Sequence, residues 1–237
     1  MTYRCLFEQS GTFKNEFKKL GYNAYDYDIL NDFNETDYQI DLYEEIIKAY
    51  DNVESIFDSF DKDDIIMAFF PCIRFENQIL LWFRGDCYCQ RNWDNLKKLQ
   101  YAMNLQCELT TNYKILSKLI IVCLTKGLGL IIENPYSTQH YLITHFPIKP
   151  TIIDKDRTLK GDYMKKPTAY WFIGIEPKYN QVNEPINYKE KITHNKLWWD
   201  KSKTVKRSLI SSDYANRFIK EYIIEWGENK WFLKNAF

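Results

Sequence analysis

Two hydrophobic spacings alternate along the chain and predict an alternation of strands and helices. Short apolar runs and one alternating run indicate strands at residues 3–7, 23–29, 64–70, 128–132 and 169–175. Apolar residues three or four positions apart predict helices at residues 12–20, 42–50, 93–126 and 212–226, the third in one piece or two. This order is typical of a doubly wound α/β sheet, which we expect to form a single domain over residues 1–237.

Ligands bind such a sheet at the carboxyl ends of its strands. The residues that follow the predicted strands are therefore the candidate site, and many of them have polar or reactive side chains. They are Glu8, Gln9, Ser10 and Gly11, the acids Asp26, Asp28 and Asp41, the pair Pro71 and Cys72, and the trio Glu133, Asn134 and Pro135. Because these strand ends lie at one edge of the sheet, we expect the side chains to share one site.

Composition narrows the class of protein. Hydrophobic residues at 45% and charged residues at 27% provide a sizeable core and exclude global disorder. The formal net charge is zero, but residues 1–64 hold 16 acids and 6 bases, whereas the remainder holds 16 acids and 26 bases. A basic second part permits a nucleic-acid partner, and a dipolar protein with solvated charges is the alternative. The aromatic share of 17% fits either stacking surfaces or a compositional bias of the genome.

Cysteine usage and the lengths of the apolar runs bear on location. The six cysteines follow no recognisable signal peptide, so we expect reduced thiols in the cytoplasm. The longest apolar runs fall far short of the roughly 18 to 20 residues that span a bilayer, so no membrane association is expected. Cys87 and Cys89 lack a second pair at metal-binding spacing, and we therefore expect no metal.

The first turn and the acids after it suit a nucleotide-like ligand. Gly11 either lets the backbone approach a ligand at a helix N-terminus or forms an ordinary tight turn. Asp28 follows the second strand and can accept hydrogen bonds from ribose hydroxyls, although Asp26 competes for this role. Asp41 opens a helix and equally suits a helix cap.

Two later strand ends bring groups for covalent chemistry. Cys72 directly follows a buried strand, and a thiolate there is a candidate nucleophile, with inert packing as the alternative. Glu133 follows the next buried strand. Partial burial would let its carboxyl group keep a proton near neutral pH and act as a general acid, and a polar turn is the alternative.

The joint order of these motifs resembles the DNA cytosine-5 methyltransferases, most closely their short phage-type and mobile-element-type members. The motifs are a Leu-Phe-x-x-x-Gly-x-Phe turn, an acid after the second strand, Asp41 before a helix, strands into Pro71-Cys72 and Glu133-Asn134-Pro135, Lys149-Pro150, the run from Lys166 to Trp171, and Arg207-Ser208. The resemblance extends over nearly the whole chain. It implies a Rossmann-like sheet of the class I methyltransferase type with a late antiparallel strand, in a bacterium or a phage-infected host cell.

The resemblance also implies roles for individual residues. S-adenosylmethionine would bind over Phe7, Glu8, Gln9, Ser10 and Gly11 and beside Pro71, with Asp28 toward its ribose and Asp41 toward its adenine. Cys72 would attack carbon 6 of cytosine, and Glu133 would protonate or hydrogen-bond N3, so that carbon 5 becomes nucleophilic enough to take the methyl group. Substrate contacts would come from Arg74, Asn134, Pro135, Lys166, Thr168 and Arg207. In duplex DNA the base must be flipped out of the helix.

Some positions depart from the family pattern. Phe70 and Ile73 flank the Pro-Cys pair where the family usually has Pro or Gly and often Gln, and Gln9 stands where larger members have Gly. The Gln-x-Arg-x-Arg motif is not visible; weak substitutes are Arg157, Lys165 and Lys166. The alternatives are therefore methylation of another nucleobase or a free nucleotide, and an inactive nucleic-acid-binding or regulatory protein with the same fold.

One basic stretch suggests where nucleic acid would bind. Residues 189–207 hold 7 bases, 2 acids and a Trp-Trp pair, within a small insertion that we expect at about residues 176–207. Bases interleaved with aromatic rings suit backbone contact and base stacking, and a solvated loop is the alternative. The loop at residues 74–91 is the second place where we expect such contact.

Overall fold

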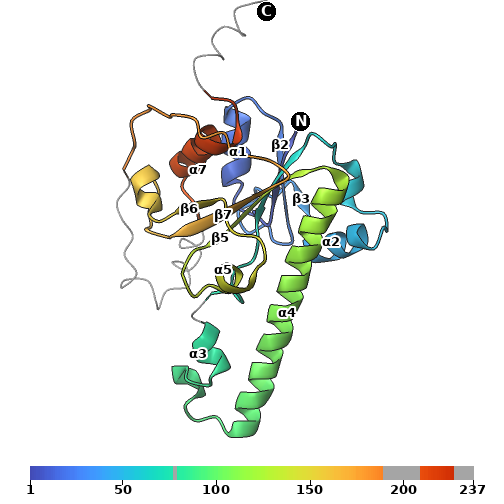
Figure 1. Cartoon of the computed structure of the whole chain (residues 1–237), viewed down its shortest axis with the longest axis vertical. Coiled ribbons are helices and arrows are strands. Elements are labelled where there is room, and N and C mark those ends of the chain that lie inside the picture. Colours follow the sequence, from blue (N-terminus) through green and yellow to red (C-terminus); the bar gives the residue numbers. More distant parts are fainter. Residues whose placement is uncertain (77–78, 189–208, 227–237) are drawn as a thin grey trace, which may run out of the picture.

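The structure, a computed structural model, describes residues 1–76, 79–188 and 209–226, which are built around one seven-stranded sheet (Figure 1). The strands are β1 Tyr3–Leu6, β2 Ala24–Asp28, β3 Tyr38–Gln39, β4 Ile65–Phe69, β5 Gly129–Pro135, β6 Ile152–Asp154 and β7 Thr168–Ile173. Their order is β3-β2-β1-β4-β5-β7-β6, and every pairing is parallel except those of β7, which runs antiparallel to β5 and β6. The predicted mostly parallel α/β sheet is confirmed.

Helices cover both faces of this sheet. The α-helices are α1 Thr12–Lys19, α2 Leu42–Tyr50, α3 Ile79–Phe83, α4 Asn95–Lys126, α5 Tyr141–His145 and α7 Ser212–Phe218. Shorter turns are η1 Ile56–Ser59, η2 Tyr88–Gln90, η3 Arg157–Lys160 and the π-helical η5 Ile219–Ile223, which continues α7. No helix among these is both long and apolar enough to cross a membrane within the described ranges.

The predicted helix at residues 93–126 forms one uninterrupted helix, α4. It contains neither Gly nor Pro, so nothing in its interior breaks the hydrogen-bond ladder. Asp94 caps its start by accepting a hydrogen bond from the backbone N–H of Lys97, and Gly127 ends it in the left-handed conformation with φ 70°. The sequence therefore set both ends of this helix.

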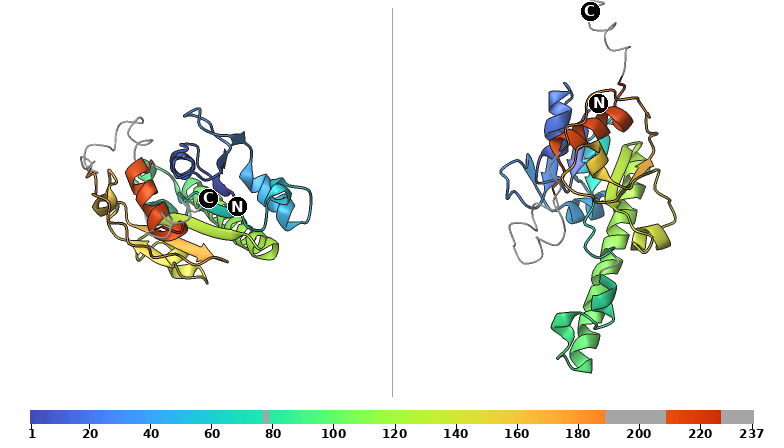
Figure 2. Two further views of the ribbon diagram at one scale, coloured as in Figure 1. Left: turned by 90° about the horizontal axis from the view of Figure 1, so that it is seen from above. Right: turned by 90° about the vertical axis from the view of Figure 1, so that its left-hand side faces the viewer.

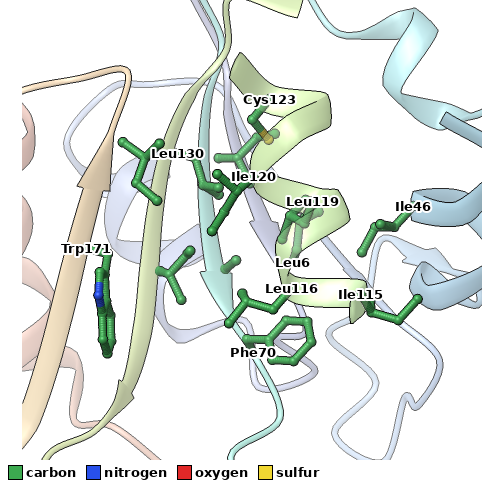
Figure 3. Packing of buried hydrophobic residues seen from close by; sticks show 14 of the residues in the cluster. Leu6, Ile46, Phe70, Ile115, Leu116, Leu119, Ile120, Cys123, Leu130 and Trp171 are labelled. Carbon is green, nitrogen blue, oxygen red and sulfur yellow. The ribbon is translucent and has the colours of Figure 1, made fainter. Parts of the chain in front are cut away.

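The sheet alternates its side chains between two hydrophobic layers, as a two-sided strand must. In β4, Ile66 and Ala68 face the layer formed with α2 and α4, whereas Ile65 and Met67 face the layer formed with α1 and α7. Figure 3 shows the first layer, where Leu116, Leu119 and Ile120 of α4 lie against side chains of the sheet; Leu6, Leu130 and Trp171 are among them. The sheet is therefore packed on both of its faces.

The first part of α4 projects beyond the sheet together with α3 (Figures 1 and 2). The buried residues of α4 begin only at Leu105, ten positions after the helix starts. Several large apolar side chains of this projection are exposed; they are Leu80, Leu81, Leu96, Leu99 and Met103. The projection follows Cys72 closely in sequence, so it extends from the same edge of the sheet as the candidate site.

The structure corrects the boundary of the fourth predicted strand. Residues 128–132 were expected to be the strand and Glu133 to follow it, but β5 continues to Pro135. The cause is the antiparallel pairing with β7, in which Glu133 lies opposite Tyr170 and Pro135 opposite Thr168. Glu133 is therefore held by a strand on either side, since Phe69 of β4 lies opposite it on the other flank.

Candidate functional site

A cavity of about 220 Å³ opens at the carboxyl ends of β1, β2, β4 and β5. Its lining combines the first turn with residues that are far apart in the sequence. The lining residues are Phe7, Glu8, Gln9, Ser10, Asp28, Phe33, Phe69, Phe70, Pro71, Cys72, Glu133, Pro135, Lys166, Leu209 and Ile210. The fold thus brings the thiol of Cys72 and the carboxyl group of Glu133 to one cavity, beside the turn after β1.

The turn after β1 has an unusual backbone. Phe7 adopts φ 60°, a left-handed conformation that is costly for a bulky residue, and its N–H donates to the carbonyl oxygen of Tyr27 on β2. Gly11 adopts φ 64° just before α1, and a Cβ there would lie 2.9 Å from a carboxylate oxygen of Glu35. Gly11 therefore satisfies a conformational and a steric requirement, although it does not line the cavity.

Glu8 lines the cavity and accepts hydrogen bonds at the N-terminus of α1. Its Oε1 accepts a hydrogen bond of 2.8 Å from the backbone N–H of Phe13, and the hydroxyl of Ser10 donates to the same atom over 3.4 Å. Burial raises the pKa of the Glu8 carboxyl to about 7, against the opposing effect of the Phe13 hydrogen bond. The Glu8 carboxyl group already accepts a hydrogen bond at the N-terminus of α1. This end of the cavity is therefore unfavourable for a phosphate group, which would need the same N–H groups.

The titration of Glu8 should make the protein less stable as pH rises. The folded carboxyl keeps its proton up to a pKa of about 7, whereas an unfolded glutamate loses it near 4.5. The native state therefore binds more protons in this window, and stability falls by roughly 2–3 kcal/mol between pH 4.5 and pH 8. Urea unfolding at both pH values should show this loss in the wild type and a much smaller one in Glu8→Gln.

Glu44→Gln is the matched control, because Glu44 lies exposed on α2. The control should retain the full pH dependence of the wild type. Parallel pH profiles for the wild type and Glu8→Gln would contradict the assignment of the titration to Glu8.

The two acids of β2 have different places. Asp28 lines the cavity, and burial raises the pKa of its carboxyl, with the Leu30 N–H donating a hydrogen bond of 2.8 Å to it. Asp26 is fully buried away from the cavity, 3.0 Å from the Nζ of Lys14. The choice that the sequence left open is therefore decided by geometry in favour of Asp28 as the acid that faces the cavity.

Cys72 lies one residue beyond Pro71 at the end of β4 and is half-buried. Burial raises the pKa of its thiol to about 12; the negative charge of Glu76 acts in the same direction, and the positive charge of Lys166 opposes it. Lys166 also lines the cavity and lies in the sequence just before β7. At neutral pH the resting cysteine is thus a thiol.

Glu133 presents an unsatisfied oxygen. Its side chain is 9% exposed, and its Oε1 accepts no hydrogen bond from any described residue. The nearest cation is Arg157, with Nη1 4.0 Å from Oε1, and Arg157 is itself ion-paired with the buried Asp162. Oε1 is thus buried beside the Arg157 guanidinium, while Glu133 as a residue lines the cavity and can offer its carboxyl group to a ligand there.

Asn134 holds the two reactive strand ends together. Its amide Nδ2 donates a hydrogen bond of 2.8 Å to the carbonyl oxygen of Phe70, the residue before Pro71. The side chain is fully buried and does not line the cavity, whereas Pro135 does. Asn134 therefore positions the segment that bears Cys72 against β5. It does not contact the cavity directly, contrary to the predicted substrate contact.

Three other predicted site residues do not line the cavity, and a fourth is not among the described residues. Asp41 caps α2 by accepting hydrogen bonds from the N–H groups of Tyr43 and Glu44, so it does not line the cavity. Arg74 turns outward to pair with Glu108 on α4. Thr168 is buried and donates to the carbonyl oxygen of Lys166. Arg207 and the basic stretch at residues 189–207 lie outside the described residues.

Sequence reasoning missed several residues around the site. Arg157 was predicted only as a weak substitute for a family motif. In the structure it is 1% exposed, and its guanidinium is ion-paired with the Glu133 carboxyl group. Phe33, Leu209 and Ile210 line the cavity from loops with no periodic signal. Glu76 is four residues from Cys72, the spacing of side chains on one face of a helical turn, and this signal was available in the sequence.

Cys87 and Cys89 lie on the projection, with their sulfur atoms 3.7 Å apart. Across residues 1–76, 79–188 and 209–226, no three His, Cys, Asp or Glu side chains gather in a way that would hold a metal ion.

A search against protein-family models finds no match for the chain, and no curated protein matches it. The proposals below therefore rest on the fold, the cavity and the resemblance of the sequence motifs.

Proposed function

We propose that the protein is an S-adenosylmethionine-dependent methyltransferase that acts on carbon 5 of cytosine in DNA through a covalent intermediate on Cys72. The observation that carries this proposal is the single cavity shared by Cys72, Glu133, Asp28 and the turn after β1. Support also comes from the sheet, which is mostly parallel and has the antiparallel late strand β7 that the resemblance implies.

The charges at the turn after β1 favour a cationic cofactor over a phosphorylated one. Glu8 occupies the N-terminus of α1, where a nucleotide phosphate would otherwise bind. Asp28 adds a second carboxylate to the same end of the cavity. A bound sulfonium or ammonium group of S-adenosylmethionine favours the ionised form of these acids and is attracted to it, and the Asp28 carboxylate suits ribose hydroxyls. When bound, S-adenosylmethionine would supply the methyl group.

Cys72 and Glu133 provide complementary chemistry for a pyrimidine ring. Carbon 5 of cytosine is a poor nucleophile until carbon 6 is attacked, and the Cys72 thiolate makes that covalent bond. The carboxyl group of Glu133, which lines the cavity, provides a group for ring N3, where it would stabilise the charge that develops upon attack. Asn134 fixes the relative position of the strand ends that bear the two groups.

Calorimetry with S-adenosylmethionine tests the cofactor assignment. The wild type should bind it, and Asp28→Ala should bind about tenfold or more weakly, since a charged hydrogen bond to ribose contributes about 1.5–3 kcal/mol. Asp63→Ala, which removes an exposed acid before β4, is the control and should bind like the wild type. If the wild-type protein shows no heat of binding at millimolar S-adenosylmethionine, the proposal is ruled out.

A further inference from the structure

A tight turn after β4 folds a second carboxyl group onto Cys72. The carbonyl oxygen of Cys72 accepts hydrogen bonds from the N–H groups of Phe75 and Glu76, at 2.8 and 3.2 Å. This single helical turn places side chains four residues apart on one side. As a result, the Sγ of Cys72 donates to Oε1 of Glu76 over 3.2 Å.

Three charged groups surround the thiol, and they come from three segments. Glu76 is on the same turn as Cys72, Glu133 is on β5, and Lys166 precedes β7. Among the described residues, only Glu76 forms a hydrogen bond with the sulfur. Lys166 attracts the thiolate, but as an ammonium ion it cannot accept its proton. The acceptor in contact with the sulfur is therefore the Glu76 carboxylate.

A thiol whose pKa burial raises to about 12 must lose its proton before or during attack on a ring carbon. At pH 7 the spontaneous thiolate fraction of such a group is only about one part in 10⁵. A carboxylate in hydrogen-bond contact removes this limitation, because the proton can move as the new bond forms. Glu76 is half-buried, and it also lines a second, apolar groove together with Phe75 and Leu109.

We propose that Glu76 is the general base that takes the proton of Cys72 while the sulfur bonds to carbon 6 of the pyrimidine. This inference rests on the proposed function and adds a catalytic residue to it. The Sγ–H bond breaks, its electron pair forms the Sγ–C6 bond, and the proton moves to Oε1 of Glu76. The C5=C6 π bond breaks at the same time, and its electron pair shifts through the ring toward N3, which leaves the enamine whose carbon 5 takes the methyl group. After methyl transfer, loss of the carbon 5 proton to water expels the sulfur, and Glu76 returns the proton to it.

The test measures how fast each variant forms a covalent adduct with an oligonucleotide that contains 5-fluorocytosine, with S-adenosylmethionine present, between pH 6 and pH 9.5. Glu76→Gln should be about 10²-fold slower than the wild type at pH 7, the lower range of general-base effects. Its rate should rise about tenfold per pH unit as hydroxide replaces the base, whereas the wild-type profile stays shallow. Glu76→Asp, which keeps a carboxylate, should retain the shallow profile at a reduced rate.

Glu54→Gln, an exposed site remote from the cavity, is the matched control and should behave like the wild type. If Glu76 only repels the thiolate, Glu76→Gln will react as fast as the wild type or faster, and this result overturns the inference. Glu76→Asp and Glu76→Gln profiles of the same slope would overturn it as well. A wild type that forms no adduct at any pH would instead refute the proposed function, so the two failures are distinguishable.

Discussion

Methyl transfer by Cys72→Ala is expected to fall more than about 10⁴-fold below that of the wild type, because removal of the nucleophile leaves only binding and electrostatic effects. Among the described residues that line the cavity, Cys72 is the only cysteine. The measurement is transfer of a labelled methyl group to DNA, to RNA and to free nucleotides. The same panel separates DNA methylation from methylation of another nucleobase or nucleotide.

Cys107→Ala is the matched control for this experiment. Cys107 is an exposed cysteine on α4, outside the loop at residues 74–91, and the same substitution there should leave transfer unchanged. Trapping with a 5-fluorocytosine oligonucleotide adds a direct readout, in which the covalent adduct of the wild type should be absent from Cys72→Ala. An adduct that survives in Cys72→Ala would exclude Cys72 as the nucleophile.

Loss of Arg157 is expected to have the largest effect on stability. Its guanidinium is ion-paired with Asp162, lies 4.0 Å from Oε1 of Glu133, and stacks 5.2 Å above the ring of Tyr214. Arg157 and Asp162 are both 1% exposed, so Arg157→Met would leave a buried carboxylate with no cation. We expect the free energy of unfolding to fall by about 3–5 kcal/mol, the usual cost of breaking a buried ion pair from one side.

Two comparison variants test this explanation by urea unfolding. Lys160→Met removes a cation from the same turn, but its partner Glu221 and Lys160 itself are about one-fifth exposed, so the loss should be about 1 kcal/mol or less. Adding Asp162→Asn to Arg157→Met should recover part of the loss, because the unpaired charge disappears. A loss below about 1 kcal/mol in Arg157→Met would contradict the importance of this ion pair.

The buried ion pair also links stability to the candidate site. Asp162 accepts a hydrogen bond from the backbone N–H of Ser211, the residue that caps α7. Through Asp162, Arg157 therefore connects β5, the strand that bears Glu133, with the start of α7, which packs on the sheet. Substitutions in this cluster should move Glu133 as well as weaken the fold.

Most of the site came from a single rule about sheets. Strands can be recognised from apolar runs, and ligands bind parallel sheets at the carboxyl ends of strands; together these place Asp28, Cys72 and Glu133 at one edge. The rule cannot separate a residue that faces the cavity from one that caps a helix. Asp41 follows the same logic, yet its carboxylate is used by the N-terminus of α2.

The residues that sequence reasoning missed depend on contacts between distant segments. Arg157 is a charged residue in an irregular stretch, where nothing in the local pattern predicts complete burial. It is buried because Asp162, Glu133 and the ring of Tyr214 converge on it from separate elements. The extension of β5 through Glu133 has a similar origin, since pairing with β7 is a long-range event.

The sequence by itself determined the α/β class, the five main strands, the continuous helix α4 and the reactive side chains at the strand ends, because periodicity, capping residues and Gly or Pro act within a few residues of one another. The tertiary structure decided which acid of β2 faces the cavity, which oxygen of Glu133 lacks a partner and which carboxylate contacts the Cys72 sulfur. These outcomes depend on burial and on the charges that other segments contribute, and both arise only when the strands and helices pack.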